Sequence, residues 1–121
     1  MKSATLFGLL LGFCVPSTAE AARCRIDRTG PLQLGATYNL NARIKESQFF
    51  RYSFRGPYAF HGIQIVKKPP TGSIVARNYE IGGSISQLGR HQLMFRVNAE
   101  NRTGRRGFFT VIMNIDVVRE C

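Results

Sequence analysis

The sequence predicts an all-β domain, most simply a sandwich of two sheets with Greek-key connections. Apolar and polar residues alternate in several short runs, and glycine- and proline-rich turns separate these runs at the spacing typical of β-strands. Beyond residue 21, no stretch has the apolar spacing of an amphipathic helix. We expect about seven strands, and a small closed barrel is the alternative architecture.

Residues 1–21 form a separate segment, which we interpret as a secretory signal peptide. Lys2 supplies a positive start, Ala4 to Val15 is an apolar run, and Ala19-Glu20-Ala21 has the small-residue pattern of a cleavage site. The apolar run is shorter than the roughly 20 residues that span a bilayer. We therefore expect export, to the periplasm or the extracellular space, of a mature domain (residues 22–121) without a transmembrane segment.

The predicted strands follow one another along the mature chain. They cover residues 23–27, 38–44, 48–55, 63–66, one or two strands within 74–81, 91–98 and 108–118. In the aromatic strand, Phe50, Tyr52 and Phe54 share one face, so we expect that face to be buried and Phe49 to be exposed. His61 falls in a predicted turn.

The chain is strongly basic. It has 17 Lys and Arg against 7 Asp and Glu, a net charge of +10, and the loss of Lys2 and Glu20 with the signal peptide leaves this balance unchanged. Arginine forms paired hydrogen bonds with carboxylates and phosphates, so polyanionic partners fit this composition. A simpler explanation of the high net charge is that it keeps the protein soluble. The charge by itself does not distinguish polyanion binding from solubility.

Two cysteines, Cys24 and Cys121, remain after removal of Cys14 with the signal peptide. In an oxidising compartment an even number favours a disulfide, here worth roughly 4–5 kcal/mol in the chain-entropy model. If the first and last strands run parallel, these cysteines pair only if residues 23–28 double back antiparallel to residues 114–121. An intermolecular bridge and two free thiols are the alternatives.

A characteristic order of turns and strands begins at Pro69. Its parts are Pro69-Pro70-Thr71-Gly72, Ile81-Gly82-Gly83-Ser84, Gly89, the alternating Leu93, Phe95 and Val97, the polar loop 98–104, and Phe109-Thr110-Val111. In these parts the chain resembles the immunoglobulin-like, cadherin-like domains of bacterial secreted and envelope proteins. The resemblance implies an immunoglobulin-like sandwich that acts as a binding or structural module at the cell envelope. It carries over no calcium site, because the few carboxylates are widely spaced.

No enzymatic role, metal site or cofactor is expected. His61 and His91 have no orienting carboxylate nearby in the sequence, and no serine lies in a nucleophile elbow. The expected partner is a protein or an anionic glycan or lipid surface at the envelope, and not a nucleic acid. The oligomeric state is open.

Basic side chains in three loops are the candidate anion-binding residues. If these loops lie at the same end of the sandwich, they form a positive tip that suits phosphate or carboxylate groups. The residues are Lys45, Lys67, Lys68, Arg102, Arg105 and Arg106. Such a tip supports an alternative function, a secreted cationic protein that binds polyanions such as lipopolysaccharide or acidic glycan.

Overall fold

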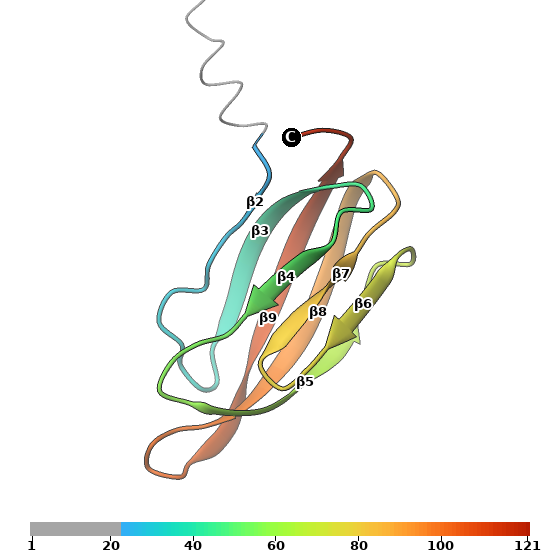
Figure 1. Cartoon of the computed structure of the whole chain (residues 1–121). Helices are drawn as coiled ribbons and strands as arrows, with labels where there is room; N and C mark the ends of the chain where they lie inside the picture. The colour runs from blue at the N-terminus through green and yellow to red at the C-terminus, as the bar shows by residue number, and fades with distance from the viewer. Residues whose placement is uncertain (1–22) are drawn as a thin grey trace, which may run out of the picture.

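The computed structural model describes residues 23–121, which form strands and loops and contain no helix (Figure 1). The strands are β2 (Arg25–Ile26), β3 (Thr37–Lys45), β4 (Phe50–Ser53), β5 (Ala59–Lys67), β6 (Ser73–Ala76), β7 (Glu80–Ser84), β8 (Gly89–Glu100) and β9 (Arg106–Val118). The all-β prediction is thus confirmed for this part of the chain. The predicted signal peptide lies outside the described residues. Within residues 23–121, no helix has the length and apolarity of a membrane span.

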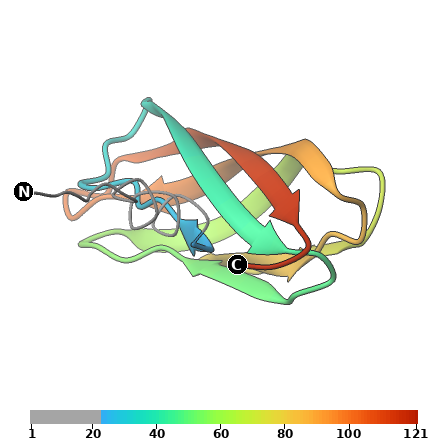
Figure 2. The ribbon, with the colours of Figure 1, turned by 90° about the horizontal axis from the view of Figure 1, so that it is seen from above.

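Two sheets pack face to face (Figure 2). The larger has the strand order β2-β3-β9-β8-β5 and the smaller the order β4-β7-β6. All neighbouring strands are antiparallel except β3 and β9, which run parallel from the pair Thr37 and Thr110 to the pair Lys45 and Val118. The predicted two-sheet sandwich is confirmed, and the closed barrel is not formed.

The core lies between the sheets and uses alternate residues of each long strand, because successive side chains of a strand point to opposite faces. Phe54, which follows β4, joins the two sheets. Its ring packs edge-to-face at 5.9 Å from the ring of Phe95 on β8 and 5.5 Å from that of Phe109 on β9. Phe50, Tyr52 and Phe54 are buried while Phe49 is 64% exposed, as predicted.

The Gly82-Gly83 pair allows the backbones of the smaller sheet to approach closely. Gly83 has φ +148°, and a Cβ there would overlap the carbonyl oxygen of Ser73 on β6. A Cβ on Gly82 would lie 2.5 Å from the carbonyl oxygen of Phe50 on β4. Both neighbours are backbone atoms of paired strands, so they cannot move aside without breaking the sheet.

Cys24 and Cys121 form a disulfide with their Cα atoms 5.2 Å apart, although 97 positions separate them in the sequence. The N-terminal segment doubles back, as predicted, but β2 pairs with β3 and not with β9, through Arg25 with Arg43 and Ile26 with Ala42. The reason is that both edges of β9 are already paired, with β3 on one side and β8 on the other.

Replacing both cysteines with serine should lower the free energy of unfolding by about 2–5 kcal/mol, because the unfolded chain loses a cross-link that closes nearly the whole domain. Urea denaturation followed by far-UV circular dichroism measures this. A reductant should lower the stability of the wild type and leave the double variant unchanged. Equal stability of the oxidised and reduced wild type would contradict the prediction.

Substitution Gly83→Ala should destabilise the fold by more than about 1 kcal/mol, because it adds backbone overlap to an unfavourable φ. Gly30→Ala is the matched control: Gly30 has φ +74° with nothing within 4 Å of a Cβ, so it carries the conformational cost alone. Thermal unfolding of the two variants should rank Gly83→Ala as the less stable. The reverse order would show that the close approach is relieved by a small shift.

Candidate functional site

The six basic residues of the predicted loop tip lie at opposite ends of the sandwich. Lys45 ends β3 beside Val118 at the carboxyl end of β9, whereas Arg106 begins β9. At roughly 3.3 Å per residue, the ends of this 13-residue strand lie on the order of 40 Å apart. The loops therefore do not form a single tip, and this expectation is corrected.

The number of strands between the basic loops explains why these loops lie at opposite ends. The segment 74–81 forms two strands, β6 and β7, which pair antiparallel. Three strands, β6, β7 and β8, then separate the loop after Lys67 from the loop 101–105, and because each strand runs from one end of the sandwich to the other, an odd number of strands leaves these loops at opposite ends. Two strands, β4 and β5, separate Lys45 from Lys67 and Lys68, so these three lysines belong to the same end.

Arg102 and Arg105 lie in an exposed loop at the opposite end. The side-chain oxygen of Asn101 orders this loop by accepting hydrogen bonds from the backbone N–H groups of Thr103, at 3.1 Å, and Arg105, at 2.9 Å. Among residues 23–121, neither arginine side chain has an acidic partner. Both are solvated loop residues.

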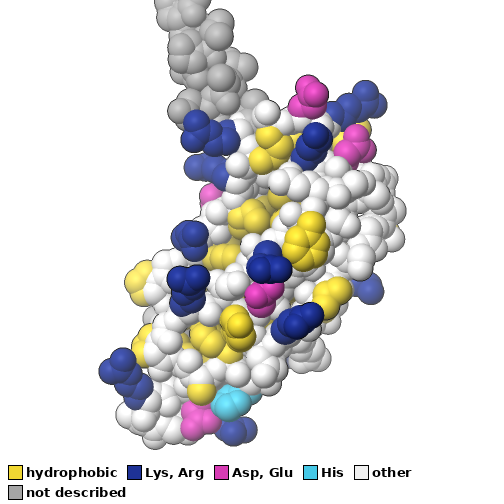
Figure 3. Space-filling model, in the orientation of Figure 1, with side chains coloured by type: hydrophobic (Ala, Val, Ile, Leu, Met, Phe, Trp, Pro, Cys, Tyr) yellow, Lys and Arg dark blue, Asp and Glu magenta, His cyan; other side chains and the backbone are white. Residues whose placement is uncertain are grey.

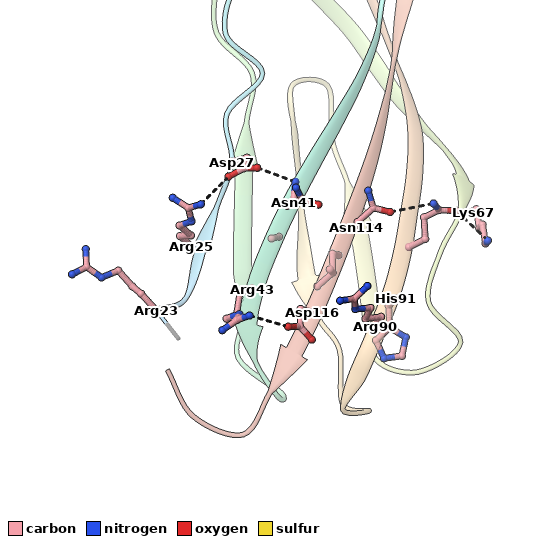
Figure 4. Close-up of a pocket in the computed structure, with 13 residues that line it drawn as sticks. Arg23, Arg25, Asp27, Asn41, Arg43, Lys67, Arg90, His91, Asn114 and Asp116 are labelled. Carbon is pink, nitrogen blue, oxygen red and sulfur yellow. Dashed lines mark hydrogen bonds and ion pairs between the residues drawn. The ribbon is translucent and has the colours of Figure 1, made fainter. Parts of the chain in front are cut away.

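A basic groove lies on the outer face of the larger sheet (Figure 4). Its volume is about 850 Å³. We use this name for the hollow whose cationic side chains are Arg23, Arg25, Arg43, Lys67 and Arg90 and whose carboxylates are Asp27 and Asp116. These side chains come from strands or strand ends that are far apart in the sequence.

Strand register brings these residues into one row. The core-facing residues of β9 have odd numbers, so Asn114 and Asp116 point to the outer face. Across the sheet, Asp116 is paired with Arg43 of β3 and with Arg90 of β8, and Arg43 is paired with Arg25 of β2. Neighbouring strands lie about 4.8 Å apart, so the row concentrates charge across four strands.

Both carboxylates of the groove are engaged by protein groups. Asp116 Oδ2 lies 3.3 Å from Nη2 of Arg43, and Asp27 Oδ1 lies 3.9 Å from Nη2 of Arg25. Asp27 Oδ2 also accepts a hydrogen bond of 3.2 Å from the backbone N–H of Asn41. Solvent-exposed ion pairs contribute about 0–1 kcal/mol to stability, so the main effect of these contacts is to position the arginines.

A polar chain continues the groove towards β5. Lys67 Nζ donates a hydrogen bond of 3.2 Å to Gln92 Oε1, and Gln92 Nε2 donates one of 3.2 Å to Asn114 Oδ1. The Lys67 side chain therefore lies against the sheet and does not extend from its loop. Of the predicted anion-binding residues, Lys67 is the one that lines the groove.

The groove has five cationic side chains against two carboxylates, a formal excess of three positive charges. Within the described part of the chain, the side chains of Arg23 and Arg90 have no acidic partner. A hollow lined mainly by one sign of charge focuses its field and attracts counter-ions. This excess of cationic side chains suits the groove to binding an anion. In residues 23–121, no group of three or more His, Cys, Asp or Glu side chains could hold a metal ion.

The outer face of the smaller sheet is different (Figure 3). There, Arg51 is paired with Glu80 at 2.9 Å and lies over the exposed ring of Phe49. The burial patterns of β4 and β6 turn Arg51 and Val75 away from the core. Cationic side chains are scattered among acidic and apolar ones in this view. The basic groove, in contrast, is lined by residues of the larger sheet and of the segments on either side of β2.

Sequence reasoning missed four of the five cations of the groove. The available signal was the polar set on strands that are otherwise apolar: Asn41 and Arg43 on β3, and Asn114 and Asp116 on β9. Alternation placed these residues on an outer face, but only the parallel pairing of β3 with β9 places them side by side.

A second hollow, of about 410 Å³, lies towards the other end of β8 and β9. We call it the Phe108 hollow, and its lining includes His61, Asn98, Arg106 and Phe108. His61 was predicted to lie in a turn, but it lies within β5. It is the extra residue of an irregularity in which Phe60 pairs with Ala99 and Gly62 with Asn98. Such bulges redirect a side chain.

Glu100 accepts two hydrogen bonds at the rim of the Phe108 hollow. Its Oε1 lies 3.1 Å from Nε2 of His61 and 3.2 Å from Nε of Arg106. These hydrogen bonds, that from His61 first and that from Arg106 second, lower the pKa of the Glu100 carboxyl group because they stabilise its ionised form. Glu100 therefore stays a carboxylate to a lower pH than an isolated side chain.

No family model matches the chain, and no curated protein matches it. Among solved structures, it is similar to the 2,6-sialyltransferase of Photobacterium sp. JT-ISH-224 (Vibrionaceae), in a ternary complex with CMP and lactose. The two share 12% sequence identity with a TM-score of 0.47, and the match covers 68% of this chain and 18% of that chain. Because the match is this weak and spans so little of the enzyme, no activity is transferred from it.

Removing either hydrogen-bond donor should raise the pKa of Glu100. We expect the carboxyl resonance of Glu100, followed by carbon-detected NMR, to titrate at higher pH in His61→Ala and in Arg106→Ala than in the wild type. Since the folded-state pKa is lowered, the stabilising contribution of these hydrogen bonds is present at neutral pH and is lost as pH falls through that pKa. Arg105→Ala is the control and should leave the midpoint in place. Unchanged midpoints in both test variants would refute this account.

Proposed function

We propose that the chain is an exported, non-enzymatic immunoglobulin-like module that binds an anionic ligand in the basic groove. The observation that carries the proposal is the excess of three positive charges in one hollow, with two arginines that have no acidic partner among residues 23–121. Guanidinium groups bind carboxylate and phosphate groups through paired, charge-assisted hydrogen bonds. The proposed anion-binding surface is therefore the outer face of the larger sheet and not the loop tip expected from the sequence.

The strand order supports the immunoglobulin-like assignment. Strands β4, β7 and β6 correspond to B, E and D of that fold, and β5, β8 and β9 to C, F and G. The first long strand, β3, lies beside the last and parallel to it. One departure is the disulfide, which joins the chain ends and not strands B and F, as in antibody domains.

Two features support export to an oxidising compartment. Disulfides persist in the periplasm and outside the cell and are rare in the cytosol, and this domain has one between Cys24 and Cys121. The apolar N-terminal segment with its small-residue cleavage pattern is the second feature. The anionic ligands available there include acidic glycans and lipid head groups.

The double variant Arg23→Ala/Arg90→Ala should bind polyanions at least about 10-fold more weakly than the wild type, since each lost charge-assisted contact costs on the order of 1 kcal/mol. The probes are heparin and inorganic polyphosphate, titrated by calorimetry in low and high salt. Wild-type binding should weaken as salt rises.

Arg102→Ala/Arg105→Ala is the matched control, because it removes the same charge from the loop at the opposite end of the domain. We expect less than about a 2-fold change in Kd. Equal losses in the two double variants would show that net charge alone drives binding. A larger loss in the control would restore the 101–105 loop as the binding surface.

A further inference from the structure

The Phe108 hollow lies on the same outer face as the basic groove. In β9 the core-facing residues have odd numbers, so Phe108, Asn114 and Asp116 share the outer face. Phe108 precedes Asn114 by six positions, which corresponds to roughly 20 Å along the strand. One extended ligand that follows β9 would therefore contact both hollows.

Phe108 offers a flat apolar surface. Its side chain is 44% exposed, and it is opposite Asn98 of β8 in the sheet. The guanidinium carbon of Arg96, also on β8, lies over the ring at 5.0 Å from its centre. The positive charge of a guanidinium group is attracted to the face of an aromatic ring. This cation–π contact favours the observed positions of the Phe108 ring and the Arg96 side chain.

Hydrogen-bond donors and acceptors are mixed around this ring. Within residues 23–121, both contacts to Glu100 use Oε1, so Oε2 is able to accept a hydrogen bond from a ligand. The amide of Asn98, which lines the hollow, can both donate and accept. Arg106 adds N–H donors that are not used by Glu100.

This chemistry differs from that of the basic groove. The Glu100 carboxylate at the rim is already hydrogen-bonded to His61 and Arg106, and its second oxygen accepts hydrogen bonds from hydroxyl groups, which a phosphate polymer lacks. A ring with many hydroxyl groups and an apolar face would stack on Phe108 and reach Glu100 and Asn98 at its edge. That is the chemistry of a sugar ring, and a plain phosphate polymer has no counterpart for it.

We infer that the ligand of the basic groove is an acidic polysaccharide, one of whose sugar rings stacks on Phe108 while its acidic groups lie among Arg23, Arg43 and Arg90. The inference rests on the proposed function and adds the ligand class. The groove supplies attraction to charge, and the Phe108 hollow distinguishes a chain of sugars from other polyanions.

Phe108→Ala tests this inference with two probes, a heparin octasaccharide and a polyphosphate of similar total charge. We expect the Kd for the octasaccharide to rise at least about 5-fold, since stacking of a ring on an aromatic side chain is removed. The Kd for polyphosphate should change by less than about 2-fold, because the cations of the groove are intact. Phe108→Tyr keeps the ring and should keep octasaccharide affinity.

Phe49→Ala is the matched control. Phe49 is 64% exposed and has Arg51 over its ring at 5.9 Å, but it lies beside the smaller sheet. Its loss should leave both affinities unchanged. If Phe108→Ala and Phe49→Ala weaken octasaccharide binding equally, the sugar subsite is wrong.

The two proposals fail in different ways. If Arg23→Ala/Arg90→Ala weakens both probes but Phe108→Ala weakens neither, the groove stands and the sugar subsite fails. If Arg23→Ala/Arg90→Ala has no effect, the proposed function itself fails. Single-stranded oligothymidylate is the third probe, because bases also stack on aromatic rings. Tighter binding of this probe than of the octasaccharide, with dependence on Phe108, would overturn the glycan assignment in favour of nucleic acid.

Discussion

The structure depends on the double pairing of β9. This strand is paired on both sides over most of its length, parallel to β3 from Thr110 to Val118 and antiparallel to β8 from Arg106 to Val117. Its odd-numbered residues fill the core, and its even-numbered residues form the centre of the outer face that carries both hollows. Because both edges of β9 are occupied, the N-terminal segment pairs with β3 at the edge of the sheet. From there, Cys24 forms the disulfide with Cys121 that joins the two ends of the domain. That connection also places Arg23 and Arg25 in the lining of the basic groove.

The carboxylates of this chain hold arginines in place and leave its excess positive charge uncompensated. Asp27, Asp116, Glu80 and Glu100 each contact an arginine, two of them in the basic groove, one on the smaller sheet and one at the Phe108 hollow. Because these pairs are partly exposed, they contribute little to the free energy of folding. Their effect is geometric: each orients a guanidinium group at a defined point of a rigid sheet. Binding groups on strands are positioned more accurately than groups on loops, which distinguishes the groove from the solvated arginines of the 101–105 loop.

Much of the fold could be predicted from the sequence because its signals are local. The alternation in β3, β8 and β9, the buried face of Phe50, Tyr52 and Phe54, and the exposure of Phe49 follow from the period of two in a strand. The even count of cysteines favoured the disulfide without excluding an intermolecular bridge or free thiols. The candidate site could be predicted only in part. Lys67 was named, but whether residues 74–81 contain one strand or two decided at which end the 101–105 loop lies, and short strands give weak signals. The position of His61 was missed because a bulge depends on pairing with β8.

By itself, the sequence determined the class of fold, the faces of the long strands and the high positive charge, since composition and short-range periodicity encode these properties. It favoured a disulfide between Cys24 and Cys121 but left other pairings open, and the structure decided the pairing. Only the tertiary structure decided which charged residues lie together. Arg25, Arg43, Asp116 and Arg90 come from four strands, and their row exists because of register between strands that are distant in the sequence. A shift of one residue in register would turn every side chain of a strand to the opposite face. Register is set by packing of the whole core, so the location of a site on a sheet face follows from the fold and not from a local motif.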